Sequence, residues 1–194
     1  MAYTTTADTK AYLGVSGSGD DTLIDAFVAA AQAAVDQYFL RTFEASTNTV
    51  RYFDAVRDVS GRRLLLDRDL CAINSITNGN GETVTSGQYT TYPRNDTPYY
   101  AIDLLKSAGI NWEYEDDSEG AIAVSGKWAY SLTAPASVVH LTKWLAAFMY
   151  RAKDNVPQTG GGGAGVAAAV DILAGDVPAD IRILMSTIPR RGVF

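Results

Sequence analysis

The glycine-rich segment TGGGGAGVAAAV, residues 159–170, has a spacing that could bind a phosphate. Gly160, Gly162 and Gly165 follow the G-x-G-x-x-G pattern with which a backbone cradles pyrophosphate. That chemistry needs a strand before the glycines and a helix after them, so that free N–H groups point at the phosphate. The preceding residues have helical spacing instead, and no Lys-Ser or Lys-Thr pair follows as in a P-loop. We therefore predict a flexible connecting loop and no cofactor.

The other reactive side chains are few. His140 is the only histidine, and Ser137 precedes it by one turn of the same predicted helix. This arrangement has neither a turn to expose the nucleophile nor a carboxylate to orient the imidazole. The single cysteine, Cys71, lies in the strand-like run CAINSIT and is expected to be a small buried hydrophobe. One cysteine and one histidine are too few for a zinc site.

Five acidic side chains between two predicted strands could bind calcium: Glu113, Glu115, Asp116, Asp117 and Glu119. They lack the alternating carboxylates and the glycine of an EF-hand loop, so we predict a solvated turn and no metal. The residue inventory therefore predicts no catalytic residues and no enzyme.

Composition and charge limit the function further. The chain has 194 residues, of which 47% are hydrophobic and 20% charged, as expected for a soluble protein with one core or one core and an inserted subdomain. A net charge of −6 argues against a protein that grips nucleic acid through its phosphates, although DNA could still slide past it. The sequence has no apolar run of membrane-spanning length and no signal peptide, so we expect synthesis in the cytoplasm and no membrane partner.

Two helices are predicted near the N-terminus. Thr4 to Thr6 can cap a short helix, ADTKAYL, which Gly14 ends. Asp20 and Asp21 precede the clearest helix of the sequence, TLIDAFVAAAQAAVDQYF, whose apolar residues recur at three and four. Its polar stripe of Asp25, Gln32 and Asp36 is narrow, and alanines coat much of the remainder. Because small side chains let another helix approach closely, more than one of its faces should be covered.

The middle of the chain has a twofold period. Antiparallel strands and an Asn-Gly hairpin are predicted in five segments: TVRYFD, RRLLLD, SITNGNGETVT, INWEYE and AIAVSGKWAY. A long apolar helix is predicted to follow from Pro135 to about Lys153. Its polar residues His140, Lys143 and Arg151 fall near one line along the helix. A last helix begins at Pro178 and stops at Pro189.

The predicted fold class is α+β. An N-terminal helix pair and the long C-terminal helix form a bundle, which carries an inserted antiparallel β-rich subdomain and an extended C-terminal tail. The expected parts are the N-terminal helices (1–47), the β-rich subdomain (48–131), the long helix (132–156), a glycine-rich loop (157–177), and a short helix with a docking tail (178–194).

A chain of this size has limited volume in which to bury both an alanine-coated helix and an aromatic-rich one. We therefore expect contacts between subunits to bury the remaining faces of these helices. The residues expected at these contacts are Ala26, Ala30, Ala33, Trp144 and Phe148.

Taken in order, several motifs resemble the head-tail connector (head-completion adaptor) family of tailed bacteriophages. They are AYLGV, DDTLIDAFVAAAQAAVDQYFLRTF, YFD, LLLDRDLCAINSITNGNGE, AIAVSGKWAYSLTAPASVVHLTKWLAAFMYRAKD and VPADIRILMSTIPRRGVF. The resemblance covers nearly the whole chain except about 93–110 and the glycine-rich loop. Two features depart from the family pattern: the turn WAYS lacks the expected glycine before its tyrosine, and the loop GGGGAG is unusually rich in glycine.

The resemblance implies a ring, usually of twelve copies, beneath the portal protein at the capsid vertex. Such a ring extends the DNA channel and offers a surface to the next neck or tail protein. Its partners would be the portal protein, a neck or tail completion protein and other copies of itself, with double-stranded DNA only as passing cargo. It would be located in the virion neck. Twelve copies at −6 carry about −72, and a negative channel lets DNA pass without adhering.

The C-terminal segment is the predicted portal-docking site. Its apolar face would be Ile181, Leu184, Met185 and Ile188, and its anchor Arg190, Arg191 and Phe194. A chain end of this kind orders when a partner covers it. Two alternatives remain open: another virion ring, such as a stopper or tail terminator, and a soluble nucleotide-binding protein that uses the glycine-rich loop.

Overall fold

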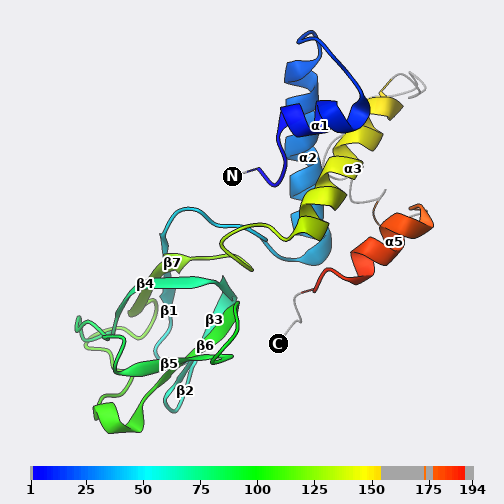
Figure 1. Cartoon of the computed structure of the whole chain (residues 1–194). Coiled ribbons are helices and arrows are strands. Elements are labelled where there is room, and N and C mark those ends of the chain that lie inside the picture. The colour runs from blue at the N-terminus through cyan, green and yellow to red at the C-terminus, as the bar shows by residue number, and fades with distance from the viewer. Residues whose placement is uncertain (1, 154–172, 174–176, 191–194) are drawn as a thin grey trace. The chain divides into compact units, whose positions relative to one another are not determined.

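The chain divides into a helical unit and a β unit (Figure 1). The computed structural model describes residues 2–153, 173 and 177–190. The helical unit consists of Met1–Arg41 and Ala134–Phe194, and the β unit is Thr42–Thr133. The β unit is thus an insertion between helices, and the predicted mixture of helices and antiparallel strands is confirmed.

The described helices are α1 (Thr6–Leu13), α2 (Asp21–Phe39), α3 (Ala136–Ala152) and α5 (Ala179–Ser186). Their ends follow local chemistry. The Thr5 side chain caps α1 by accepting a hydrogen bond from the Asp8 N–H at 3.0 Å, and Gly14 ends it with a φ of 71°. Pro135 immediately precedes α3, and Pro178 precedes α5.

The core of the helical unit lies between α2 and α3. These two helices pack on each other, α1 contacts both, and α5 contacts α3. The buried side chains of α2 and α3 recur at three and four, so each of these helices buries one side and exposes the other. They are Ile24, Phe27, Val28, Ala31, Ala34, Val35 and Phe39 on α2, and Val138, Leu141, Thr142, Leu145, Ala146, Ala147 and Met149 on α3.

The β unit contains two antiparallel sheets. One has the strand order β1 (Thr49–Phe53), β7 (Ile122–Lys127), β4 (Ala72–Thr77). The other has the order β2 (Val59–Ser60), β3 (Arg63–Leu70), β6 (Tyr99–Leu104), β5 (Tyr89–Tyr92), and the short 3-10 helix η1 (Lys106–Ala108) follows β6. Alternate residues of β7 are buried, as strands with one covered face require.

Both sheets contribute to one hydrophobic core. Phe53 lies opposite Ile122 in the β1–β7 register, while Leu64 lies opposite Ile102 in the β3–β6 register. All four side chains belong to this core, and facing sheets that share a core in this way form a two-layer unit. Its buried members are Phe53, Ala55, Leu64, Leu66, Leu70, Ile76, Val84, Ile102, Leu104, Trp112, Ile122 and Val124.

The predicted strand INWEYE is wrong. Residues 110–115 form no strand, and one isolated bridge joins Gly79 to Tyr114. The alternation that suggested a strand is only partly present, because Trp112 is buried while Tyr114 is 46% exposed. The Trp112 ring nitrogen donates to the Arg62 carbonyl oxygen at 3.0 Å, which holds the segment against β3 without strand pairing.

Two side chains replace the missing strand partner. The Arg62 guanidinium donates to the Ile110 carbonyl oxygen at 2.7 Å and to the Leu104 carbonyl oxygen at 2.9 Å. Buried Asn78 donates to the Asn111 carbonyl oxygen at 2.8 Å and accepts from the Glu113 N–H at 3.1 Å. Since backbone groups removed from water need partners, these bonds let an extended segment pack on the core as a loop.

The hairpin predicted at NGNG is present, but its two glycines have different roles. Gly81 has a φ of 80°, which favours glycine. Gly79 is required for space, because a Cβ there would lie 2.3 Å from the Glu113 carbonyl oxygen and 2.8 Å from the Ala121 Cβ.

We expect Gly79→Ala to lower the free energy of unfolding by about 1–3 kcal/mol, because the added methyl group overpacks the contact with residue 113. Urea unfolding followed by tryptophan fluorescence measures this change. Gly87→Ala is the matched control, since a Cβ there meets nothing within 4 Å. It should change stability by less than about 0.5 kcal/mol. Equal effects of the two substitutions would contradict the close approach at Gly79.

Candidate assembly surfaces

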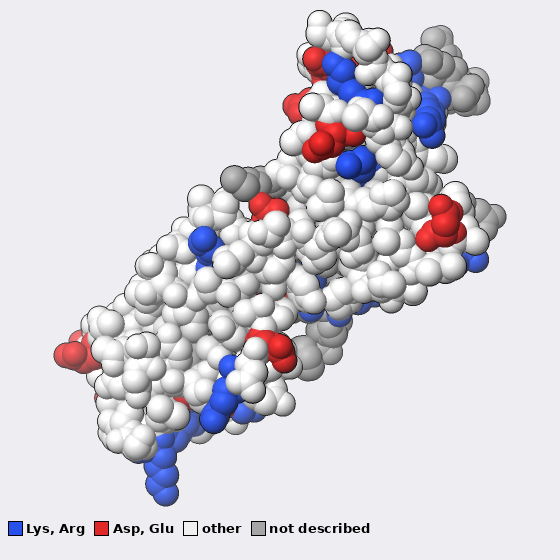
Figure 2. Space-filling model, in the orientation of Figure 1, with Lys and Arg blue, Asp and Glu red and all other residues white. Residues whose placement is uncertain are grey.

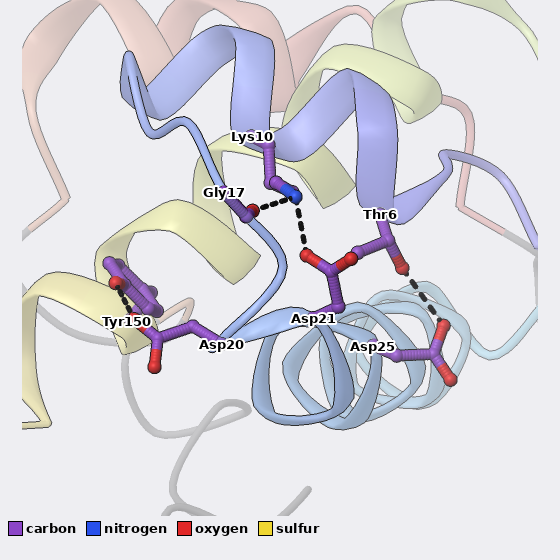
Figure 3. Close-up of polar contacts among 7 residues, drawn as sticks. All are labelled: Thr6, Lys10, Gly17, Asp20, Asp21, Asp25 and Tyr150. Carbon is purple, nitrogen blue, oxygen red and sulfur yellow. Dashed lines mark hydrogen bonds and ion pairs between the residues drawn. The ribbon is translucent and has the colours of Figure 1, made fainter.

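Polar contacts join α1 to the start of α2 (Figure 3). The Lys10 ammonium of α1 contacts the Asp21 carboxylate and donates to the Gly17 carbonyl oxygen. One turn along each helix, the Thr6 hydroxyl donates to the Asp25 carboxylate at 3.1 Å. Because the two contacts are on successive turns, they fix how α1 lies against α2.

A further contact joins α2 to α3. Asp20 is the N-cap residue of α2, where a carboxylate interacts favourably with the positive end of the helix dipole. Its oxygen also accepts a hydrogen bond from the Tyr150 hydroxyl, near the end of α3. The start of α2 therefore meets the end of α3, so the two helices run antiparallel. In the view of Figure 2, acidic and basic side chains intermix over this end of the helical unit.

The side of α2 opposite its buried residues carries small side chains. We call Ala26, Ala29, Ala30 and Ala33 the open face of α2; the first two are exposed and the others half-buried. A groove of about 430 Å³ runs beside them, and it is lined by Ala2, Asp25, Val28, Ala29, Gln32, Ala33 and Asp36. Since interhelical distance depends on the side chains at the contact, this face can accept a close neighbour.

The N-terminal residues border this groove. The Tyr3 hydroxyl donates to an Asp36 carboxylate oxygen at 2.5 Å, and the Tyr3 N–H donates to the Gln32 side-chain oxygen at 3.0 Å. Burial raises the pKa of Asp36 from 3.8 to about 6, against the smaller opposing effect of the Tyr3 hydrogen bond. Sequence reasoning identified Asp36 only as part of a polar stripe, because Tyr3 precedes the first helix and no periodicity connects the two.

The open face of α3 is aromatic. Phe148 is 42% exposed, Trp144 is half-buried, and their ring centroids are 5.6 Å apart. Exposed His140 and Arg151 lie on the same side of the helix, and the His140 ring meets the Tyr12 ring edge-on at 6.1 Å. We define the open face of α3 as these four α3 residues. The structure thus places all five residues expected at subunit contacts on two outward sides of the helical unit.

The predicted portal-docking face lies inside the helical unit. Ile181, Met185 and Ile188 are buried, and Leu184 is half-buried. Beside them is a cleft of about 1040 Å³, which is lined by Tyr38, Phe39, Leu173, Val177, Arg182, Met185, Ser186, Ile188, Pro189 and Arg190. While α5 holds this position, its apolar residues serve the chain's own packing. A portal contact through them requires α5 to leave it.

Two arginines hold the end of the described chain. The Arg190 guanidinium lies 4.3 Å from the centre of the Tyr38 ring and donates to the Tyr38 carbonyl oxygen at 3.0 Å. Arg41 donates to the Pro189 carbonyl oxygen at 3.2 Å. The described part of the predicted extended tail is therefore packed against the end of α2. Arg191 and Phe194 lie outside the described residues, as does the glycine-rich loop apart from Leu173 and Val177.

The remaining candidate chemistry is modest. Cys71 is buried as predicted, its thiol donates to the Lys127 carbonyl oxygen at 3.3 Å, and burial raises the pKa of the thiol. The acidic residues of 113–119 are exposed. Among the described residues, no three His, Cys, Asp or Glu side chains come together in a way that could hold a metal ion. The described helices also include none with the length and apolar character needed to cross a membrane.

Net charge differs between the two units. The β unit has thirteen acidic and eight basic residues, a net charge of −5, whereas the helical unit has nine and eight, a net charge of −1.

Together these features define a class of protein: a two-unit α+β chain whose helical unit presents one alanine-lined and one aromatic outward face. No family model matches the sequence, and no curated protein matches it significantly. Solved structures do match. A chain of the neck of an empty GTA particle, computed with C6 symmetry, aligns with a TM-score of 0.53 at 13% identity, covering 86% of each chain. A chain of the virion of a native gene transfer agent particle aligns with a TM-score of 0.48 at 15% identity, again over 86% of each. The first match shows a shared fold.

The raised pKa of Asp36 predicts that the stability of the fold depends on pH. Its pKa is higher in the folded chain, so between 3.8 and about 6 the folded state binds more protons than the unfolded state. Stability is therefore lost as the pH rises through this window. We expect Asp36→Asn to match the wild type near pH 3.5 and to be more stable at pH 7 by about 1 kcal/mol, a figure that allows for solvent screening.

Thermal unfolding at pH 3.5 to 7.5 measures this difference. Gln37→Ala, an exposed change on the same helix that does not titrate, is the control and should keep the wild-type pH profile. An Asp36→Asn profile parallel to that of the wild type would contradict the assignment.

Proposed function

We propose that this chain is a structural protein of the neck of a phage or phage-like particle, where it forms a ring between the capsid portal and the tail. The observation that carries the proposal is the fold shared with a neck chain over 86% of both chains. The order of motifs in the sequence supports the same class, since it resembles head-tail connectors. The cytoplasm of the host is the site of synthesis, and the virion neck is the final location.

The ring is a homo-oligomer of twelve copies. The neck that contains the similar chain was computed with sixfold symmetry, and a ring of twelve contains that symmetry. The open faces of α2 and α3 are the subunit contacts. A neighbouring aromatic pair with one exposed ring, Phe148, and one half-buried ring, Trp144, is typical of a surface that a partner covers.

The ring extends the DNA channel and does not hold the DNA. Twelve copies carry about −72 in total, and most of this charge belongs to the β units. A negative channel repels phosphates across a hydrated gap, so DNA passes as cargo. The next neck or tail completion protein binds the ring on the side away from the portal.

The portal contact is made by the C-terminal segment. Its anchor is Arg190, Arg191 and Phe194, and the apolar residues Ile181, Leu184, Met185 and Ile188 join the contact when α5 moves from its place beside α3. Arg190 is held by one hydrogen bond to the Tyr38 carbonyl oxygen and by the rings of Tyr38 and Phe39, so its exchange for a portal contact replaces few interactions.

We expect the double variant Arg191→Ala with Phe194→Ala to bind the portal protein of the same particle at least tenfold more weakly, because it removes a charge and an apolar contact from the anchor. Its thermal unfolding should equal that of the wild type. The matched control is Val56→Ala with Arg57→Ala, an exposed apolar and basic pair of the β unit. Biolayer interferometry measures binding, and electron microscopy shows whether rings stack on the portal.

Rings that stack on a tail protein and ignore the portal would assign the chain to the stopper or tail-terminator rings. Unchanged portal binding by the double variant would remove the C-terminal anchor from the proposal.

A further inference from the structure

The open faces of α2 and α3 match in length and charge. On α3, basic Arg151 and His140 are eleven residues apart, and the aromatic pair lies between them. On α2, Asp25 and Asp36 are also eleven residues apart, and the groove beside Ala29 and Ala33 lies between them. At a rise of 1.5 Å per residue, each pair spans about 16–17 Å of helix.

We propose that the open face of α2 in one copy packs against the open face of α3 in the next copy. This inference rests on the proposed ring and names the contact that builds it. The aromatic side chains of α3 enter the groove along the alanines of α2, and the basic residues at the two ends of the aromatic pair meet the two aspartates. The occupant of the groove is thus a second copy of this chain.

Shape supports this pairing. The groove of about 430 Å³ lies where α2 carries alanines, so it is concave and bordered by small side chains. The ring of Phe148 projects from α3 at 42% exposure, with Trp144 beside it. Aromatic side chains supply a large contact area for few rotatable bonds, and a concave surface of small residues is the complement that they require.

The acidic residues of the α2 face and the basic residues of the α3 face also support this pairing. Asp36 is partly buried in the groove wall, and one of its carboxylate oxygens accepts a hydrogen bond from the neutral Tyr3 hydroxyl. A carboxylate has further acceptor positions, so an arginine from the next copy can bind beside Tyr3. Asp25, which accepts from the Thr6 hydroxyl, is exposed and can do the same.

The faces are unlike, and this makes the contact head-to-tail. Pairing α2 with α2 would bring aspartates together, and pairing α3 with α3 would bring Arg151 against Arg151 or His140. Because α2 and α3 bury the sides that face each other, their open faces point away from the shared core. Each copy then has neighbours on two different sides, and such a head-to-tail contact forms a ring when the rotation between copies closes.

Two blocking variants test the pairing. Ala29→Trp fills the α2 groove with a bulky neutral ring, and Phe148→Glu places a carboxylate on the α3 face, so the two blocked faces do not attract each other; both positions are exposed, and both variants should fold as the wild type does. Each variant alone should be monomeric at concentrations where the wild type forms rings. Mixed together, they should form a one-to-one dimer and nothing larger, because only one intact pair of faces remains.

Native mass spectrometry counts the copies, and circular dichroism confirms folding. The matched controls are Ala7→Trp on α1 and Leu65→Glu on β3, both at exposed positions that belong to neither face, and both should form rings. A homodimer of either blocking variant, or a mixture that stays monomeric, would overturn the head-to-tail pairing. Rings that survive both blocking changes would overturn the pairing and leave the proposed ring intact. A wild-type chain that forms no ring alone or with the portal would instead overturn the proposed function.

Discussion

The packing of α2 against α3 organises the helical unit. Each helix buries one side in this contact, and the hydrogen bond from Tyr150 to Asp20 joins the start of one helix to the end of the other. The antiparallel pair determines which sides remain outward. Alanines face out on α2 and aromatic rings on α3, and α5 occupies the remaining space beside α3 and the end of α2. Both candidate assembly surfaces are consequences of this one contact.

The β unit obeys a different rule, because its loops are held by side chains. Two sheets share one core, yet residues 110–115 reach that core without joining either sheet. Arg62 and Asn78 supply the hydrogen bonds that a neighbouring strand would otherwise supply. Such bonds connect residues more than thirty positions apart, so no local pattern could reveal them. The same distance explains why Gly79 was predicted for its turn conformation, whereas its role is to leave room for residue 113.

The C-terminal helix shows the same limit at the candidate site. Its limits at Pro178 and Pro189 and its apolar side were readable from the sequence, and the helix formed where expected. The sequence did not show which surface the apolar side of this helix packs against. An amphipathic helix must bury one side, but its pattern is the same whether the cover is another subunit or the chain itself. Here Ile181, Met185 and Ile188 are covered by the chain itself.

Local patterns were enough to predict the capped helices, the alternating strands and the turn at Gly81, and they offered too few reactive side chains to predict an active site. The sequence also identified the small and aromatic residues that lie outward on α2 and α3. Long-range packing, in contrast, brings Tyr3 onto Asp36, stacks Arg190 on Tyr38 and turns the apolar side of α5 inward. The physical reason is that periodicity and capping act within one segment, whereas burial and pKa depend on which distant segments meet.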